Sequence, residues 1–129
     1  MRYRLLALAL SVSGALMTAP VAGPALAAGD AAHGKAVFAR CAICHKAGKD
    51  EGDGIGPNLF GIAGRKAAGE PGFGYSGPLK NSHIVWTDAN LTKWVAGPMR
   101  MVPGTKMAFP GLSSKKDQRD VVAYLDTLK

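Results

Sequence analysis

One pentapeptide, Cys41-Ala42-Ile43-Cys44-His45, constrains this chain more than any other part of it. Two thiols in a C-x-x-C pattern, followed at once by an imidazole, have the spacing that attaches a c-type haem covalently. Each thiol adds to one vinyl group of the porphyrin, and the residue that follows then lies beneath the ring. On a helix the three side chains leave from one face, and a neutral imidazole there can bind the iron. The pentapeptide therefore predicts one covalent haem with His45 as proximal ligand.

Two closely spaced cysteines also fit a redox dithiol, part of a zinc site or a structural disulfide. A structural zinc site needs about four ligands, whereas the chain has two cysteines and only His33 and His83 besides His45. A thioredoxin-like dithiol is expected within a βαβ pattern, which this sequence lacks. These alternatives are weaker than haem attachment, which the export signal described next also favours.

The first 27 residues are typical of a Sec signal peptide. Arg2 and Arg4 form a charged start, residues 5–17 form an apolar stretch, and Ala25-Leu26-Ala27 is a small-x-small cleavage site. The apolar stretch is shorter than the roughly 20 residues that a transmembrane helix needs. We therefore expect cleavage after Ala27, a periplasmic location without stable membrane insertion, and one mature domain over residues 28–129.

The charge of the expected mature domain is basic. Without Arg2 and Arg4 the chain keeps 14 of its 16 basic residues and all nine acidic residues, a net charge of +5. This balance favours acidic protein partners or anionic membrane surfaces, whereas export and the lack of a basic helix disfavour nucleic acid. The 17 glycines and 8 prolines predict long loops around a small core. A bulky apolar cofactor would complete such a core.

Helix signals occur at both ends of the expected domain. Asp30 is a candidate N-cap for a helix over residues 31–44, in which Gly34 and Phe38 lie on the same face as the pentapeptide. Ser114 and the Asp117 three residues later resemble a capping box for the last helix. We expect the apolar face of that helix, with Val121, Tyr124, Leu125 and Leu128, to pack against Gly34 and Phe38.

The middle of the chain predicts mostly loop. Glycines interrupt any long periodicity between residues 46 and 85, with one short helix expected over residues 77–81. Thr87 is a candidate N-cap for a helix that Gly97-Pro98 ends. Residues 99–112 are expected to be irregular, with turns at Pro103-Gly104 and Pro110-Gly111.

The sixth ligand of the iron decides whether the site is open or closed. The candidates are His33, His83, Met99, Met101 and Met107. His33 shares a helix with His45, so it cannot reach the distal face, and nothing around His83 favours ligation. Met107 is the best candidate because a stiff turn presents it, although any of the methionines can equally fill a core or lie exposed.

A longer set of residues resembles class I cytochromes c of the mitochondrial and bacterial periplasmic type. The resemblance covers essentially the whole expected domain, and its combination of motifs is specific even though each short motif is not. It rests on Gly34, Phe38, Cys41-Ala42-Ile43-Cys44-His45, Gly56-Pro57-Asn58-Leu59, Gly61, Gly64-Arg65-Lys66, Pro71-Gly72-Phe73-Gly74-Tyr75, Trp86, Pro103-Gly104-Thr105-Lys106-Met107, Phe109 and Ala123-Tyr124-Leu125.

The resemblance implies an all-α fold in which crossed first and last helices, shorter helices and long loops enclose one covalent haem c. It makes Met107 the sixth ligand and gives the carbonyl of Pro57 the second ring N–H of His45. It places Arg65, Tyr75 and Trp86 where they hydrogen-bond or neutralise the haem propionates, because carboxylates in a partly closed pocket require donors and positive charge. The further haem-contacting residues it implies are Ser76, in place of the usual threonine, and Thr105.

Two residues depart from the family pattern. Trp94 stands where many relatives have a tyrosine whose hydroxyl reaches the methionine sulfur, and Leu79 stands where they commonly have an asparagine. Either the pocket is simply repacked, or the loss of polar groups changes the reduction potential of the iron.

The function that the resemblance implies is that of a monomeric periplasmic one-electron carrier, which is not an enzyme. Its relatives take electrons from a cytochrome bc1-type quinol-oxidising complex or a periplasmic dehydrogenase such as methanol dehydrogenase, and pass them to a cytochrome oxidase or a photosynthetic reaction centre. We expect basic residues at the haem edge to steer docking to acidic surfaces: Arg40, Arg100, Lys106, Lys115 and Lys116. The alternative is a haem peroxidase or gas-binding protein with an open sixth position.

Overall fold

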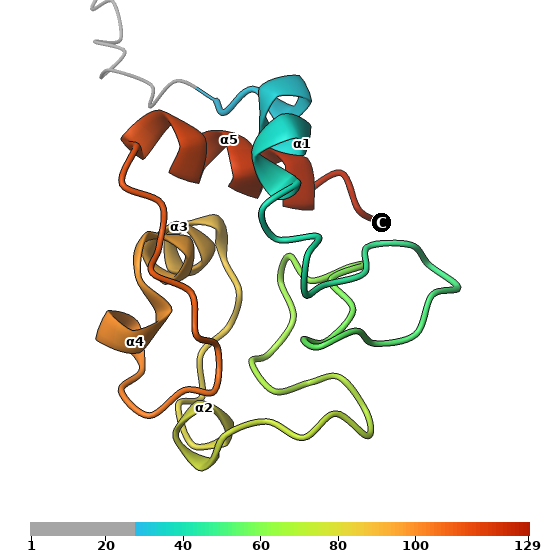
Figure 1. Cartoon of the computed structure of the whole chain (residues 1–129), viewed down its shortest axis with the longest axis vertical. Coiled ribbons are helices and arrows are strands. Elements are labelled where there is room, and N and C mark those ends of the chain that lie inside the picture. The colour runs from blue at the N-terminus through green and yellow to red at the C-terminus, as the bar shows by residue number, and fades with distance from the viewer. Residues whose placement is uncertain (1–27) are drawn as a thin grey trace, which may run out of the picture.

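The computed structural model describes residues 28–129, so the expected signal peptide and its cleavage site lie outside the described range. In that range the helices are α1 (Ala31–Phe38), α2 (Gly77–Lys80), α3 (Asp88–Ala96), α4 (Pro98–Met101) and α5 (Lys115–Leu125) (Figure 1). Residues 28–129 contain no β-strand beyond an isolated antiparallel bridge between Lys66 and Val85. The predicted all-α class is confirmed. None of the helices in this range is long and apolar enough for a membrane crossing.

Helices α1 and α5 cross each other, as the sequence predicts (Figure 1). The crossing is close because α1 has no side chain at Gly34, where an added Cβ would collide with the backbone carbonyl of Asp120. Next to this contact, the rings of Phe38 and Tyr124 lie 5.1 Å apart between centroids. Val121, on the same face of α5, is fully buried. The two helices therefore form one end of the hydrophobic core.

Side-chain caps start α1, α3 and α5 at the residues that the sequence indicates. Asp30 accepts hydrogen bonds from the backbone N–H groups of Ala32 and His33 at the start of α1. Thr87 caps α3, and Ser114 caps α5 by accepting from the N–H of Asp117 at 3.2 Å. These bonds satisfy N–H groups that have no partner within their own helix.

Two predicted elements need correction. Helix α1 ends at Phe38 rather than Cys44, because the N–H groups of Arg40 and Cys41 bond three residues back and tighten the backbone into turns. The expected irregular segment after Gly97 begins instead with the short helix α4. Pro98 occupies the first position of α4, where its missing N–H costs nothing.

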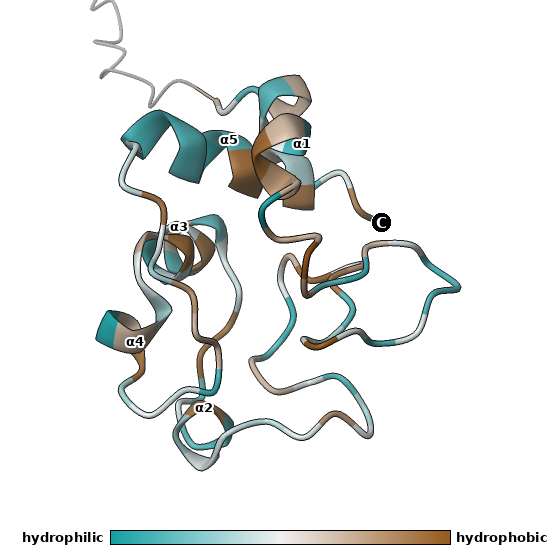
Figure 2. Ribbon diagram, viewed as in Figure 1, coloured by the Kyte–Doolittle hydropathy of each residue, from teal (hydrophilic) through white to brown (hydrophobic). Residues whose placement is uncertain are grey.

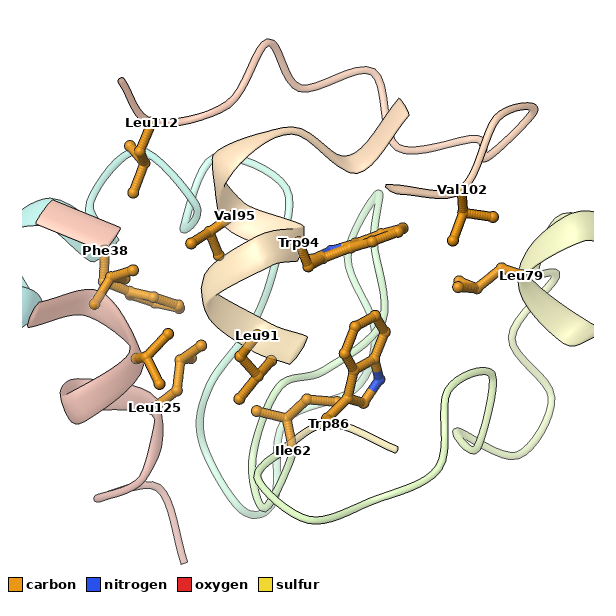
Figure 3. Packing of buried hydrophobic residues seen from close by; sticks show 12 residues of the cluster. Phe38, Ile62, Leu79, Trp86, Leu91, Trp94, Val95, Val102, Leu112 and Leu125 are labelled. Carbon is orange, nitrogen blue, oxygen red and sulfur yellow. The ribbon is translucent and has the colours of Figure 1, made fainter. Parts of the chain in front are cut away.

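The core fills the space between the helices and the loops. Figure 2 shows hydrophobic residues along the inner sides of α3 and α5 and a hydrophilic first half of α5. In Figure 3 the Trp86 ring lies between the Trp94 ring and Ile62, while Leu79 and Val102 point toward each other. Trp86 and Trp94 are 5.1 Å apart between ring centroids. The same side chains border the cavity described next.

Candidate haem site

A cavity of about 310 Å³ lies in the centre of the described chain and has mainly apolar walls. This volume falls at the lower end of the range for small-molecule pockets. Segments far apart in sequence meet around it. Residues 41–59 and residues 102–112, which lie on the right and left of Figure 1, contribute Cys41, Cys44 and His45 from the first segment and Met107 from the second.

The pentapeptide forms tight turns that keep one helical hydrogen bond. The N–H groups of Cys44 and His45 both donate to the carbonyl of Cys41, each at 3.0 Å. Because the second bond spans four residues, His45 still lies one turn after Cys41, although the segment is outside α1. The cysteines and the histidine therefore line the same cavity, as the sequence predicts.

Two neighbours set the orientation of the His45 ring. Its Nδ1 lies 2.7 Å from the carbonyl oxygen of Pro57, and because a carbonyl only accepts, Nδ1 carries the proton. Gly56 packs so closely on the ring that a Cβ there would overlap it. Nε2 is thus the unprotonated nitrogen, which is the form that binds a metal.

Both cysteines are free thiols and partly buried. Burial raises the pKa of the Cys41 thiol, an effect that the nearby Arg40 partly offsets. A reactive dithiol needs the opposite, a lowered thiol pKa. The direction of the Cys41 pKa is thus opposite to that of a reactive thiol.

Among the candidate sixth ligands, only Met107 lines the cavity. His83 is exposed, and Met99 is exposed on α4. Met101 packs against the core away from the cavity lining. His33 lies on α1, where its Nδ1 is 2.7 Å from the Asp120 carboxylate. The structure therefore brings Met107 and His45 together and separates the other candidates from the cavity.

The residues expected at the propionates divide into two groups. Tyr75, Ser76, Trp86 and Thr105 line the cavity, whereas Arg65 does not. The guanidinium of Arg65 pairs with Glu70 through Nη1 at 3.0 Å. Its buried Nε has no hydrogen-bond partner in residues 28–129. A buried donor without a hydrogen-bond partner lowers the stability of the fold. Because this donor belongs to a cationic guanidinium, it suits an anionic acceptor.

The hydroxyls of Tyr75 and Ser76 already have protein partners. The Tyr75 oxygen accepts from the N–H of Glu70 at 3.2 Å, and burial raises the pKa of this phenol. The buried Ser76 caps α2 by accepting from the N–H of Leu79 at 3.3 Å. Both residues thus connect the cavity wall to the backbone around it.

The two departures from the family pattern, Trp94 and Leu79, both border the cavity. Each is more than nine-tenths buried, and Trp94 packs against Trp86. Leu79 belongs to α2 and faces Val102 (Figure 3). This wall is apolar where the family commonly has polar side chains.

The expected basic ring is only partly at the cavity. Arg40 and Lys106 line it, and the Arg40 guanidinium lies 5.8 Å from the ring centroid of Phe109. The Lys106 ammonium donates to the carbonyl of Gly74 at 2.9 Å, which connects two loops. Lys116 instead binds Asp120 at the crossing of α1 and α5. Arg100 and Lys115 are exposed and lie outside the cavity lining.

Sequence reasoning missed the polar residues behind His45. Asn58 is buried, and its side-chain amide donates to the carbonyls of Gly48 and Glu51 at 2.9 and 2.6 Å. Asp53 accepts from the N–H of Asn58 at 2.8 Å. The only signal in the sequence is an asparagine directly after Gly56-Pro57, in a loop rich in glycine and acidic residues.

The side chains around the cavity fit a covalently attached haem. Two free thiols lie beside an imidazole whose Nε2 is unprotonated, and a thioether borders the same space. The walls are mainly apolar, and Tyr75, Ser76, Trp86 and Thr105 add polar groups to the lining. This combination meets the needs of a porphyrin with two carboxylates.

Comparison with known proteins identifies the family of the chain. The cytochrome c family model matches residues 31–129. Cytochrome c-554 of Methylosinus trichosporium is 46% identical over 116 residues, which cover 90% of this chain and 88% of that protein. Cytochrome c2 of Rhodomicrobium vannielii is 46% identical over 103 residues, covering 80% of this chain and 82% of that protein.

A solved structure has the same fold. Cytochrome cH from Methylobacterium extorquens superposes with a TM-score of 0.73 at 47% identity, covering 77% of this chain and 99% of that one. The family match, the two relatives and this structure agree on the family and the fold. The chain belongs to the cytochrome c family of electron carriers, which are not enzymes and which bind haem c covalently.

Proposed function

We propose that this protein is an exported one-electron carrier with a single haem c, attached through Cys41 and Cys44 and ligated by His45 and Met107. The observation that carries the proposal is the shared cavity, in which the imidazole has its Nε2 free and Met107 is the one sixth-ligand candidate in the lining. Two protein ligands leave no open coordination position, which favours electron transfer over binding of oxygen or peroxide.

The bound haem supplies the one-electron chemistry, and the chain provides its setting. Pro57 and Gly56 hold the His45 ring in one orientation, so the ligand need not rearrange between oxidation states. The apolar walls, including Leu79 and Trp94, exclude water from the cavity. A rigid, dry environment keeps the structural change during electron transfer small.

Four polar residues of the cavity lining, together with Arg65 outside it, are proposed to hold the propionates. Arg65 offers its unpartnered Nε, and Trp86 offers an indole N–H in the cavity lining. Tyr75, Ser76 and Thr105 add hydroxyls in the same lining. Together they provide the donors and the positive charge that two carboxylates require.

The proposed partners are redox proteins with acidic docking surfaces. Electrons would come from a cytochrome bc1-type complex or a periplasmic dehydrogenase such as methanol dehydrogenase, and would leave to a terminal oxidase or reaction centre. Arg40 and Lys106, at the cavity, support this proposal together with the basic charge of residues 28–129. Such encounters are brief, weakened by salt and compatible with a monomeric carrier.

The ligand assignment is tested by replacing Met107 in the full chain, produced in a bacterium that attaches c-type haem. Wild-type protein is expected to retain its haem through acid-acetone extraction and, when ferric, to show the weak red absorption band of sulfur ligation. Met107→Ala should keep the haem and lose the band. Met99→Ala, a matched change at an exposed methionine, should keep both. A wild-type protein without the band would favour an open-site haem protein.

The proposed export has its own measurement. The full chain should be recovered from the periplasmic fraction, and mass spectrometry of the mature protein should find its N-terminus at Ala28. Recovery of uncleaved protein from the membrane fraction would contradict both the cleavage site and the location.

A further inference from the structure

One peptide unit behind His45 is hydrogen-bonded at both ends. The carbonyl of Pro57 accepts from His45 Nδ1 at 2.7 Å. The N–H of the same peptide unit, which belongs to Asn58, donates to Asp53 Oδ1 at 2.8 Å. A carboxylate is therefore connected to the imidazole through a single peptide group.

The surrounding loop holds this peptide unit in place. The buried side chain of Asn58 donates to the carbonyls of Gly48 and Glu51 and accepts from the N–H of Phe60 at 2.8 Å. The loop over residues 48–60 thus wraps around one side chain. This fixes the peptide plane between Asp53 and His45, so both hydrogen bonds are kept together.

The connection has an electronic consequence. Hydrogen bonds in a chain polarise one another, and a bond to a charged acceptor is stronger than a neutral one. A carboxylate on the N–H therefore makes the Pro57 carbonyl a better acceptor for the His45 proton. A stronger bond at Nδ1 raises the basicity of a ligating histidine and so favours the oxidised metal.

We propose that Asp53 is a positioning residue that acts through the Pro57–Asn58 peptide to strengthen electron donation by His45 and lower the midpoint potential. This inference rests on the proposed ligation of haem by His45. Asp53 is exposed, so its direct field at the iron is screened by water. The hydrogen-bonded connection is local and is not screened in this way.

Asp53→Asn tests the proposal, because the amide retains an acceptor of the same shape and loses only the charge. The matched control is Glu51→Gln, in the same loop. Glu51 is also exposed, and its carboxylate accepts from the N–H of Gly48 at 2.8 Å rather than from the peptide next to His45. The change in charge is the same, so the two variants differ in the connection to His45.

Two quantities are measured on each haem-loaded protein: the midpoint potential, and the NMR shift of the His45 Nδ1 proton in ferrous protein with ¹⁵N-labelled histidine. In Asp53→Asn the potential should become more positive and the proton resonance should move upfield. In Glu51→Gln both should match the wild type. Asp53→Glu, which restores the charge, should recover part of both shifts.

Other outcomes overturn the inference. Equal potential shifts in Asp53→Asn and Glu51→Gln would assign the effect to net charge alone, and no shift in either would show that the connection has no effect. A shift in Asp53→Asn that Asp53→Glu fails to reverse, with faster exchange of the Asn58 amide proton, would assign Asp53 a purely structural role. A wild-type protein without covalent haem or His45 ligation would instead contradict the proposed function.

Discussion

The two sides of the cavity are built differently. On the His45 side, residues 44–59 are joined by short backbone hydrogen bonds, such as Gly56 N–H to Cys44 carbonyl at 2.8 Å and Leu59 N–H to Lys46 carbonyl at 2.9 Å. On the Met107 side, residues 103–111 have few hydrogen bonds in the described chain, and the N–H of Met107 reaches the Thr105 hydroxyl at 3.4 Å. One side is fixed by its own backbone, and the other depends on contacts with distant segments.

This difference indicates that the His45 side of the cavity is rigid and that the Met107 side can open locally. The His45 ring is held by Pro57 and Gly56. The Met107 segment is held by its attachment to α3, where Leu112 donates to Val95 at 2.8 Å, and by the hydrogen bond from Lys106 to Gly74. Local opening favours regions with few buried bonds. We therefore expect the methionine, rather than the histidine, to be displaced first.

The largest expected effect is on the rigid side. In Gly56→Ala the new methyl group would overlap the His45 ring, and overpacking of this kind costs about 1–3 kcal/mol. Urea unfolding should show this loss in free energy, together with poorer haem incorporation. Gly52→Ala is the control, because a Cβ there has no neighbour within 4 Å, and it should change stability by less than about 0.5 kcal/mol. Similar unfolding midpoints for the two variants would refute the inference that close packing of Gly56 holds the His45 ring in one orientation.

A second change concerns the α1–α5 crossing, which contributes Phe38, Val121 and Leu125 to the cavity lining. A hydrogen bond from Lys116, with further bonds from the Asp30 N–H and from His33, lowers the pKa of the buried Asp120. A depressed carboxyl pKa contributes stability above the unfolded-state pKa of about 3.9, and this contribution is lost as pH falls below it.

Asp120→Asn should therefore flatten the decline in unfolding free energy below about pH 4. At neutral pH it should cost less than Gly56→Ala, because the Lys116 and His33 side chains are 60% and 41% exposed, so solvent screens their attraction to the carboxylate. The ligands of the iron should stay the same, which can be read from the absorption spectrum. Acid unfolding as steep as that of the wild type would show that Asp120 does not set the acid stability.

The next prediction tests the Met107 side of the cavity. Lys106→Met removes the hydrogen bond to Gly74, which is worth about 0.5–1.5 kcal/mol. Free imidazole should then displace Met107 from ferric protein roughly 2- to 12-fold more readily in a spectroscopic titration. Lys93→Met, at an exposed lysine of α3, should leave the imidazole affinity unchanged. An equal affinity in both variants would mean that the Met107 segment is held by packing alone.

The smallest expected effect concerns Trp94. It distinguishes a role in setting the reduction potential of the iron from simple repacking of the pocket. Trp94→Tyr would place a hydroxyl in the lining of the cavity that Met107 also borders. A hydroxyl that donates to the thioether draws electron density from it, so the midpoint potential should become more positive. Stability should change by about 1 kcal/mol or less, the scale of an aromatic pair such as Trp86 with Trp94. A midpoint equal to that of the wild type within error would mean that tryptophan only fills space.

Much of the fold was predictable because its signals are local. Asp30, Thr87 and Ser114 begin helices through bonds to N–H groups two or three residues away, and a glycine at position 34 indicates a close helix contact. The end of α1 at Phe38 was not predictable, because switching to three-residue hydrogen bonds leaves no mark in the pattern of residues. Helix α4 was missed because Pro98 both ends one helix and begins the next.

The sequence by itself predicted the attachment chemistry, because Cys41, Cys44 and His45 lie within one turn and have the spacing of covalent haem attachment. Only the tertiary structure decided that Met107 shares the His45 cavity, that Lys106 binds Gly74 and that Asp53 connects to His45 through a peptide. Such contacts depend on how loops close around a core. The spacing of residues along the chain does not record that closure.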